Sequence, residues 1–252
     1  MKISIIGVGN IGGTLAKQYR EAGHTVLITN SRGPETLEDL AKAIGATAVA
    51  VPDATKGVDV VVVSIPLKNI PDLPKDLFAE VPDDVVVIDT SNYYPGMQGT
   101  PRIEAIEAGM PESQWVAAQL RRPVIKAYNS ILAASLANKG RPKGTAGRIA
   151  LPVAGDDPRA KAIVIGLLEA TGFDGVDAGT LAESWQFQPG TPGYCTDLGA
   201  NDLVRALAAA DRAQAPHRRD LMMQKYAELG EGATGDDIIN LVRSIVGTVV
   251  RG

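Results

Sequence analysis

The chain contains very few cysteine, histidine and aromatic residues. Among its 252 residues there are one cysteine and two histidines, and Phe, Trp and Tyr together make up 4 %. A single cysteine cannot form an internal disulfide, and no CxxC or HExxH pattern occurs, so neither a disulfide framework nor a metal site is expected. Because aromatic residues are scarce, we expect a core of Ala, Val, Ile and Leu.

Long basic runs and long apolar runs are also missing. The formal net charge is −4, and no more than two basic residues stand together, which argues against a nucleic-acid surface. No apolar stretch is long enough to span a bilayer, and the first one ends at Gly7, too early for a secretory signal. We therefore expect a cytoplasmic protein whose partner is a small molecule, not a nucleic acid or a membrane.

Short β-branched runs alternate with helical segments through the first 180 residues. Strands are predicted at 2–6, 25–29, 47–50, 58–64, 85–89, 124–126, 148–153 and 173–177, and helices at 11–22, 34–44, 131–138 and 158–170. This alternation is typical of a parallel sheet with right-handed crossovers. The nearly continuous valine run over 58–63 is typical of a strand covered on both faces. We predict an α/β fold with a doubly wound parallel sheet.

The strand pattern stops near residue 190. Helices are predicted at 197–214, 216–229 and 235–250, joined by Pro216 and a glycine-rich turn. We therefore predict two parts: a sheet domain over 1–190 and a short helical C-terminal extension over 191–252. The extension would shape a substrate pocket, form a dimer interface, or do both.

The last predicted helix is apolar around much of its circumference. Two adjacent stripes can be drawn on it, formed by Ile238, Val242, Ile245 and Val249 and by Ile239, Leu241, Val246 and Val250. A helix packed on one core needs an apolar face only about 100° wide. Either this helix is buried within its own subunit, or it also packs against a second subunit. We expect a homodimer joined through it.

A glycine-rich turn follows the first predicted strand. The run Gly7-Val8-Gly9-Asn10-Ile11-Gly12 has the GxGxxG spacing inside a strand-helix-strand unit. Gly7 allows a tight turn, Gly9 lets the backbone approach a pyrophosphate, and Gly12 lets the helix pack closely on the strand. The helix N-terminus offers free N–H groups to phosphates. A glycine-rich turn without a ligand is the alternative, but the context favours dinucleotide binding.

The end of the second predicted strand carries no acidic residue. Sites that prefer NAD place Asp or Glu there to bind the ribose 2′-hydroxyl. Here the run is Asn30-Ser31-Arg32. A hydroxyl and a guanidinium suit a 2′-phosphate, so we expect NADP(H) as the cofactor and a Rossmann-type NADP-binding domain. The alternative is that Ser31 and Arg32 cap the next helix and face water.

Polar loops follow several later strands, at the sheet edge where ligands of open α/β sheets bind. They contain Ser64-Ile65-Pro66, Ser91-Asn92 and Tyr128-Asn129-Ser130, and a further aromatic and polar loop spans 185–190. For any single residue, ordinary turn chemistry is the alternative. The candidate substrate residues are Ser91, Asn92, Tyr128, Trp185 and Gln188.

No residue stands out as a catalytic acid, base or nucleophile. His24 lies between the first helix and the second strand, away from the expected cofactor edge, and His217 lies at a helix start. Cys195 has no histidine partner in the sequence pattern, and we expect it to be buried and inert. The catalytic residues are therefore left unassigned.

Taken together, these motifs resemble the family of NADPH-dependent F420 reductases, which is related to the cytoplasmic oxidoreductase domain of STEAP-type metalloreductases. The similarity covers roughly residues 1–195. Its markers are the glycine motif at 7–12 and the runs Asn30-Ser31-Arg32, Val63-Ser64-Ile65-Pro66, Lys126-Ala127-Tyr128-Asn129-Ser130, Val153-Ala154-Gly155-Asp156-Asp157 and Asp177-Ala178-Gly179-Thr180-Leu181.

The resemblance implies specific contacts with the cofactor. It implies that the pyrophosphate is bound by Asn10 and Ile11 and the 2′-phosphate by Ser31 and Arg32. It places Asn129 near the nicotinamide, and along the cofactor it places Ser64, Ile65 and Pro66. It also implies hydride transfer between stacked rings, in which the cofactor supplies the chemistry and the protein supplies alignment.

The expected function is NADPH-dependent hydride transfer to a planar acceptor, either deazaflavin F420 or a flavin. The sequence departs from the family pattern at two places. Glu35 and Thr36 occupy positions where the family sometimes has a second basic residue after the arginine, which bears on 2′-phosphate binding. The tail from about residue 196 does not match the family core, which bears on the identity of the acceptor. One alternative is an imine or pyrroline-carboxylate type of reductase, although that class adds a larger helical dimer domain. A non-enzymatic module that senses the NADP redox state is the other.

Overall fold

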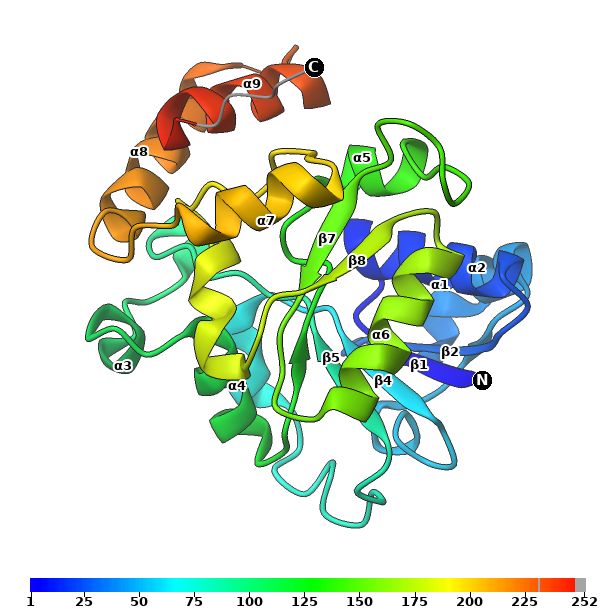
Figure 1. Cartoon of the computed structure of the whole chain (residues 1–252). Coiled ribbons are helices and arrows are strands. Elements are labelled where there is room, and N and C mark those ends of the chain that lie inside the picture. Colours follow the sequence, from blue (N-terminus) through cyan, green and yellow to red (C-terminus); the bar gives the residue numbers. More distant parts are fainter. Residues whose placement is uncertain (231, 248–252) are drawn as a thin grey trace.

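Strand β1 (Lys2–Ile6) lies inside a six-stranded parallel sheet with the order β3-β2-β1-β4-β5-β6. The computed structural model of the chain describes residues 1–230 and 232–247 (Figure 1). The remaining strands of this sheet are β2 (Thr25–Thr29), β3 (Thr47–Ala48), β4 (Val60–Val63), β5 (Val86–Asp89) and β6 (Ile125–Lys126). The winding reverses between β1 and β4, which is the Rossmann arrangement. The predicted α/β fold is confirmed.

Both faces of the sheet are covered, and the strand residues alternate between two apolar clusters. In β4, Val60 and Val62 pack into one cluster and Val61 and Val63 into the other, and all four side chains are fully buried. The predicted covering of this strand on both sides is therefore confirmed. Helices α1 (Asn10–Glu21), α2 (Glu38–Ile44), α5 (Ala133–Asn138) and α6 (Pro158–Ala170) contribute to the first cluster, and α4 (Glu112–Leu120) and a 3₁₀ turn (Leu67–Asp72) to the second.

The last two predicted strands do not extend the main sheet. Strands β7 (Ala150–Val153) and β8 (Asp174–Asp177) form a separate two-stranded parallel sheet. An antiparallel bridge between Lys126 and Ala154 links the end of β6 to the end of β7. Because this bridge is antiparallel, β7 cannot continue the parallel ladder, a change of direction that the strand pattern alone does not reveal.

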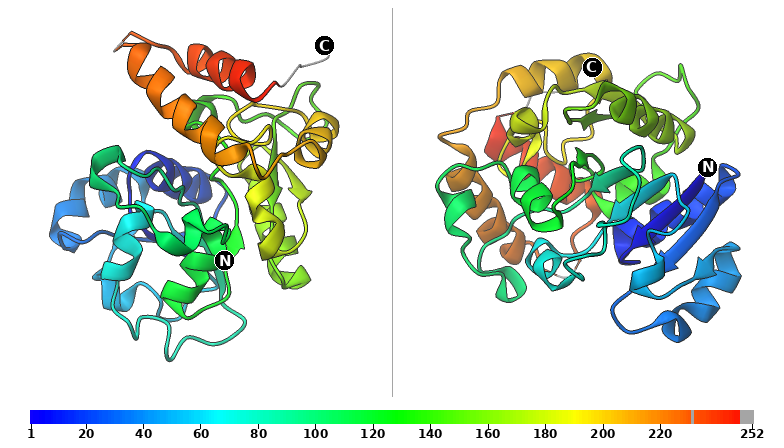
Figure 2. Two further views of the ribbon diagram at one scale, coloured as in Figure 1. Left: turned by 90° about the vertical axis from the view of Figure 1, so that its left-hand side faces the viewer. Right: turned by 90° about the horizontal axis from the view of Figure 1, so that it is seen from below.

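After the small sheet the described residues form a 3₁₀ helix (Leu181–Phe187) and then the α-helices α7 (Ala200–Ala208), α8 (Ala215–Glu228) and α9 (Gly235–Val246). Helix α7 starts later than predicted, because Asp197 has a positive φ of 47°, which a right-handed helix excludes, and it ends at Ala208 instead of 214. It packs on β7 and β8, whereas α8 and α9 lie side by side as an outer layer far from the N-terminus (Figures 1 and 2). The predicted stripe residues Val249 and Val250 lie outside the described residues.

The segment between β5 and β6 contains helical structure that the sequence pattern did not predict. Helix α3 (Glu104–Glu107) is a single turn, and α4 follows it. Helix α4 buries Val116 and Leu120 against the sheet and also buries the polar residues Glu112 and Ser113. In the part of the chain that the structure describes, no helix is both long enough and apolar enough to cross a membrane.

Candidate functional site

The turn after β1 requires glycine at two positions and leaves open space at a third. Gly7 has a φ of 97°, and a Cβ there would overlap the carbonyl of Ser64. A Cβ on Gly12 would overlap the carbonyl of Gly7, whereas one on Gly9 would meet no atom within 4 Å. Gly7 and Gly12 thus allow close packing, and Gly9 leaves room for a ligand to approach the backbone.

Helix α1 starts at this turn with an N-terminus suited to an anion. Its N-cap is Gly9, which makes no side-chain cap, and its first turn contains no acidic residue. The first N–H groups of a helix have no partner within the helix, and the helix dipole makes this end partly positive. These groups can therefore bind phosphate oxygens directly.

The loop after β2 presents a hydroxyl and a guanidinium to solvent. The Asn30 side chain fixes the loop, since its Oδ1 accepts from the Arg32 N–H at 2.9 Å and its Nδ2 donates to Thr36 Oγ1 at 2.9 Å. Ser31 and Arg32 are exposed, and among the described residues Arg32 has no ion-pair partner. The next helical turn begins after Gly33 without a side-chain cap, so neither residue caps it.

Two cavities meet at the carboxyl edge of the main sheet. The β2-side cavity, of about 680 Å³, is lined by Gly7, Gly9, Ser31, Arg32 and the run 64–66, among others. The β5-side cavity, of about 270 Å³, is lined by Asn10, Ile11, Ser91 and Asn92, among others. Four residues line both cavities and mark the edge along which the cavities adjoin: Gly9, Ser64, Ile65 and Pro66. The structure thus brings most of the predicted cofactor residues together.

Several lining residues were not predicted from the sequence. Among them are Val51, Asn69, Asp72 and Leu73 in the β2-side cavity and Lys68, Tyr94, Met97 and Thr100 in the β5-side cavity. Lys68, Asn69 and Tyr94 lie within three residues of a predicted motif. Val51 lies near none of the predicted motifs in the sequence, so its place in the cavity follows only from the fold.

Asn129 lies behind the β5-side cavity and holds one of its lining residues. Its backbone carbonyl accepts from Asn92 Nδ2 at 2.9 Å, and its own Nδ2 donates to Asn92 Oδ1 at 3.2 Å and to the Phe187 carbonyl at 3.0 Å. The side chain is 3 % exposed. Beside this pair, the hydroxyls of Tyr94 and Tyr194 are hydrogen-bonded to each other.

Three of the predicted substrate residues lie elsewhere. Tyr128 is fully buried in the core, and its hydroxyl accepts from the Tyr19 hydroxyl at 2.9 Å. Trp185 and Gln188 line a different small cavity of about 70 Å³, together with Arg212 and other residues. The structure therefore places Ser91 and Asn92 beside the cofactor residues but does not bring Tyr128, Trp185 or Gln188 to them.

The histidines and the cysteine lie outside both cavities. His24 Nδ1 is 3.3 Å from the N-terminal amino group, and partial burial lowers the pKa of its imidazole. His217 is exposed on α8. Cys195 is buried, and burial raises the pKa of its thiol to about 12, so the unreactive protonated form predominates at neutral pH. No metal-binding group of three or more His, Cys, Asp or Glu side chains occurs among residues 1–230 and 232–247.

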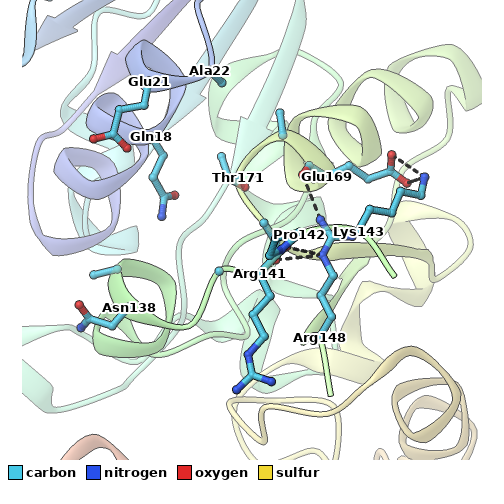
Figure 3. Close-up of a pocket in the computed structure, with 14 residues that line it drawn as sticks. Gln18, Glu21, Ala22, Asn138, Arg141, Pro142, Lys143, Arg148, Glu169 and Thr171 are labelled. Carbon is cyan, nitrogen blue, oxygen red and sulfur yellow. Dashed lines mark hydrogen bonds and ion pairs between the residues drawn. The ribbon is translucent and has the colours of Figure 1, made fainter. Parts of the chain in front are cut away.

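A third cavity, of about 480 Å³, lies between the C-terminal ends of α1 and α6 and the loop before β7 (Figure 3). Arg148 is buried in its lining, where the guanidinium donates to the carbonyls of Arg141, Gly172 and Glu169 and forms an ion pair with Asp174. None of the predicted site residues lines this cavity.

The fold and the edge where the two cavities meet define a class of protein, the dinucleotide-dependent oxidoreductases. Residues 2–93 match the model of one such family, described as NADP oxidoreductase, coenzyme F420-dependent. The protein YjhV of Escherichia coli (strain K12) is 39 % identical over 125 residues, which cover 50 % of this chain and 84 % of that protein. The chain belongs to the F420-dependent NADP oxidoreductase family and is an NADP-dependent oxidoreductase.

Two crystal structures share the fold of this chain. Hypothetical protein SMa0349 from Sinorhizobium meliloti is 32 % identical, with a TM-score of 0.60 over 72 % of this chain and 86 % of that one. A candidate F420-dependent NADP reductase from Arthrobacter sp. FB24 is 23 % identical, with a TM-score of 0.57 over 72 % of this chain and 86 % of that one. The second likeness establishes the shared fold.

Proposed function

We propose that the protein transfers a hydride between NADP(H) in the β2-side cavity and a planar acceptor, deazaflavin F420 or a flavin, in the β5-side cavity. The edge along which the two cavities adjoin carries this proposal, because Gly9, Ser64, Ile65 and Pro66 line both. Two ligands bound in these adjoining cavities would meet along this edge. Placing two reactants next to each other in a fixed orientation is the main contribution a protein makes to hydride transfer.

The residues of the β2-side cavity fit NADP(H). Open space at Gly9 and the uncapped N-terminus of α1 suit the pyrophosphate. Ser31 and Arg32 suit the 2′-phosphate, since Arg32 has no acidic partner among the described residues. Ser64, Ile65 and Pro66 would lie along the nicotinamide half. When bound, the cofactor supplies the hydride, and the chain orients it.

The β5-side cavity suits a flat ring with polar edges. Ile65, Pro66 and Met97 give it apolar surface, whereas Ser91 and Asn92 offer hydrogen-bonding groups. None of the described residues that line it is His, Cys, Asp or Glu. A reaction that needs alignment rather than a strong general acid or base fits this lining.

One observation favours a second candidate, the reduction of an imine. Tyr94 lines the β5-side cavity, and its hydroxyl is held by Tyr194. Reduction of an imine consumes a proton as well as a hydride, and a tyrosine hydroxyl can supply it. A redox-sensing module without activity would bind NADPH in the same place but oxidise none of it.

A spectrophotometric screen of NADPH oxidation separates these functions. The acceptors are F420, FMN, FAD, quinones, ferric chelates and cyclic imines. We expect turnover with F420 or a flavin, and a higher acceptor KM in Asn92→Ala but not in the control Asn138→Ala, whose side chain lies in the third cavity (Figure 3). Turnover with cyclic imines alone would favour the second candidate, and tight NADPH binding without any turnover would favour the sensor.

We also propose that the protein is a homodimer joined through α8 and α9. Part of the apolar surface of α9 is used within its own subunit, where Val242 and Val246 pack with Tyr194, Cys195 and Met222. Apolar surface nevertheless remains on this helix pair, since Ile238, Leu241 and Ile245 are only partly buried, and Tyr226 on α8 and Leu229 directly after it are exposed. A second subunit would cover this surface.

A further inference from the structure

A buried ion pair lies directly beneath the wall of the β5-side cavity. Asp89 and Lys126 end the neighbouring strands β5 and β6, where they are register partners. Both side chains are fully buried, and Lys126 Nζ lies 3.0 Å from Asp89 Oδ2. The same ammonium donates a second hydrogen bond to the backbone carbonyl of Ser91, which lines the cavity.

The carboxylate of Asp89 accepts hydrogen bonds from donors on three separate segments of the chain. Its Oδ1 accepts from the N–H of Ser91 at 2.9 Å and from the Ser91 hydroxyl at 2.6 Å. Its Oδ2 accepts from Lys126 and, at 2.6 Å, from the hydroxyl of Ser113 on α4. Ser91 is therefore held at its N–H, its side chain and its carbonyl by one buried pair of charges.

Helix α4 holds the next part of the same segment. The carboxylate of Glu112 accepts from the N–H of Tyr93 at 3.0 Å, and the Tyr93 hydroxyl accepts from the N–H of Ile103 at 2.8 Å. The β5-side cavity is lined by residues of this segment: Thr90, Ser91, Asn92 and Tyr94. Much of this wall is thus held by side chains that do not line the cavity themselves: Glu112, Ser113 and Lys126.

Stability alone does not account for a fully buried ion pair. Removing two charges from water is costly, and well-packed apolar residues in their place are often as stabilising or more so. Three other buried basic residues form ion pairs with aspartates among the described residues, but each of these aspartates is partly or fully exposed: Asp83 with Arg122, Asp174 with Arg148 and Asp220 with Arg219. The Asp89–Lys126 pair instead fixes the geometry of a cavity wall.

We propose that Lys126 is a positioning residue for the acceptor: through Asp89 and the Ser91 carbonyl it holds Ser91 and Asn92 in the orientation that binds the acceptor ring. The proposal rests on the proposed function for the identity of the ligand in the β5-side cavity. Its structural part, the restraint of the segment 90–94, is independent of any activity.

The test compares Lys126→Met with Arg148→Met, which removes a buried basic residue that lines the third cavity and not the β5-side cavity. For each folded variant we would measure the dissociation constant of NADPH, kcat and KM with F420 or FMN, and amide hydrogen exchange over residues 90–94. We expect Lys126→Met to raise the acceptor KM about tenfold or more and to speed exchange at Ser91 and Tyr93. NADPH binding should stay within about twofold. In Arg148→Met none of these readouts should change.

The outcomes separate this proposal from the proposed function. If the parent protein reduces neither F420 nor FMN, the proposed function fails, and the hydrogen exchange still decides the positioning role. If Lys126→Met does not fold, the double variant Asp89→Asn with Lys126→Met removes both charges and takes its place. Three results would each overturn the proposal. The first is a folded variant whose hydrogen exchange over 90–94 and acceptor KM equal those of the parent, and the second is an equal effect in Arg148→Met. The third is a double variant that also cannot fold.

Discussion

The buried carboxyl of Glu112 predicts an unusual dependence of stability on pH. The side chain is 3 % exposed, and burial raises its pKa to about 7 from an ordinary value of 4.5. Asp89 also raises the pKa, whereas Lys126, the Tyr93 N–H and Arg219 oppose the shift. Because the folded protein binds this proton more tightly than the unfolded chain does, the associated stability is present below about pH 4.5 and is lost as the pH rises towards 7.

The size of this loss follows from the two pKa values. A pKa of about 7 in place of 4.5 corresponds to roughly 3 kcal/mol between the two protonation states. Glutamine at this position cannot ionise, yet its carbonyl oxygen can still accept from the Tyr93 N–H. The stability advantage of Glu112→Gln over the parent should therefore grow by roughly 2–3 kcal/mol between pH 5 and pH 8.

Urea unfolding of both proteins at pH 5, 6, 7 and 8 measures this difference directly. Glu104→Gln is the matched control, because Glu104 is an exposed acid on the neighbouring helix α3. The control should follow the parent at every pH, and groups that titrate in both proteins cancel in the comparison. If the Glu112→Gln protein loses stability with rising pH in parallel with the parent, the buried carboxyl is not responsible and the reasoning is wrong.

Three other predictions concern the cofactor, the chemistry and the assembly. Arg32→Ala should weaken NADPH binding about ten- to a hundredfold, because a charged hydrogen bond worth roughly 1.5–3 kcal/mol is lost, and it should leave NADH binding almost unchanged. Equal losses of affinity for both cofactors in calorimetry would refute the 2′-phosphate assignment. Replacing His24, His217 or Cys195 by alanine should leave the maximal rate, measured by stopped flow, within about tenfold of that of the parent. Loss of a general acid or base would lower the rate by about 10²- to 10⁴-fold. Light scattering should show a dimer for the full chain and a monomer or insoluble protein for a chain ending at Gly230, and a full chain that is monomeric at micromolar concentration would refute the dimer.

Local sequence signals identified the parts of the site that depend on neighbouring residues. The glycine turn at 7–12 and the absence of an acid after β2 are properties of a few consecutive residues, and their places in the structure follow from the strand that precedes each. The same holds for the valine run of β4, whose burial on both faces requires only a covered parallel sheet. These features led to the correct fold and cofactor class.

Features that depend on distant segments could not be found in this way. Asp89 and Lys126 are 37 residues apart, and their pairing becomes visible only when β5 and β6 lie in register. No local pattern indicates that the polar residues Glu112 and Ser113 of α4 are buried against β5 and the loop after it. Trp185 has the composition of a pocket residue, but the chain path carries it to a separate cavity.

The central claim is that a hydride passes directly between two ligands whose rings meet where the two cavities adjoin, along Gly9, Ser64, Ile65 and Pro66. The most direct measurement uses NADPH carrying deuterium on one or the other face of its nicotinamide, with F420 or FMN as the acceptor, and follows the label by mass spectrometry and the rate by stopped flow. We predict that deuterium from one face alone is transferred, with a primary isotope effect when the transfer step is observed. Loss of label from both faces equally, or tight NADPH binding with no reduction of any acceptor, would contradict the claim.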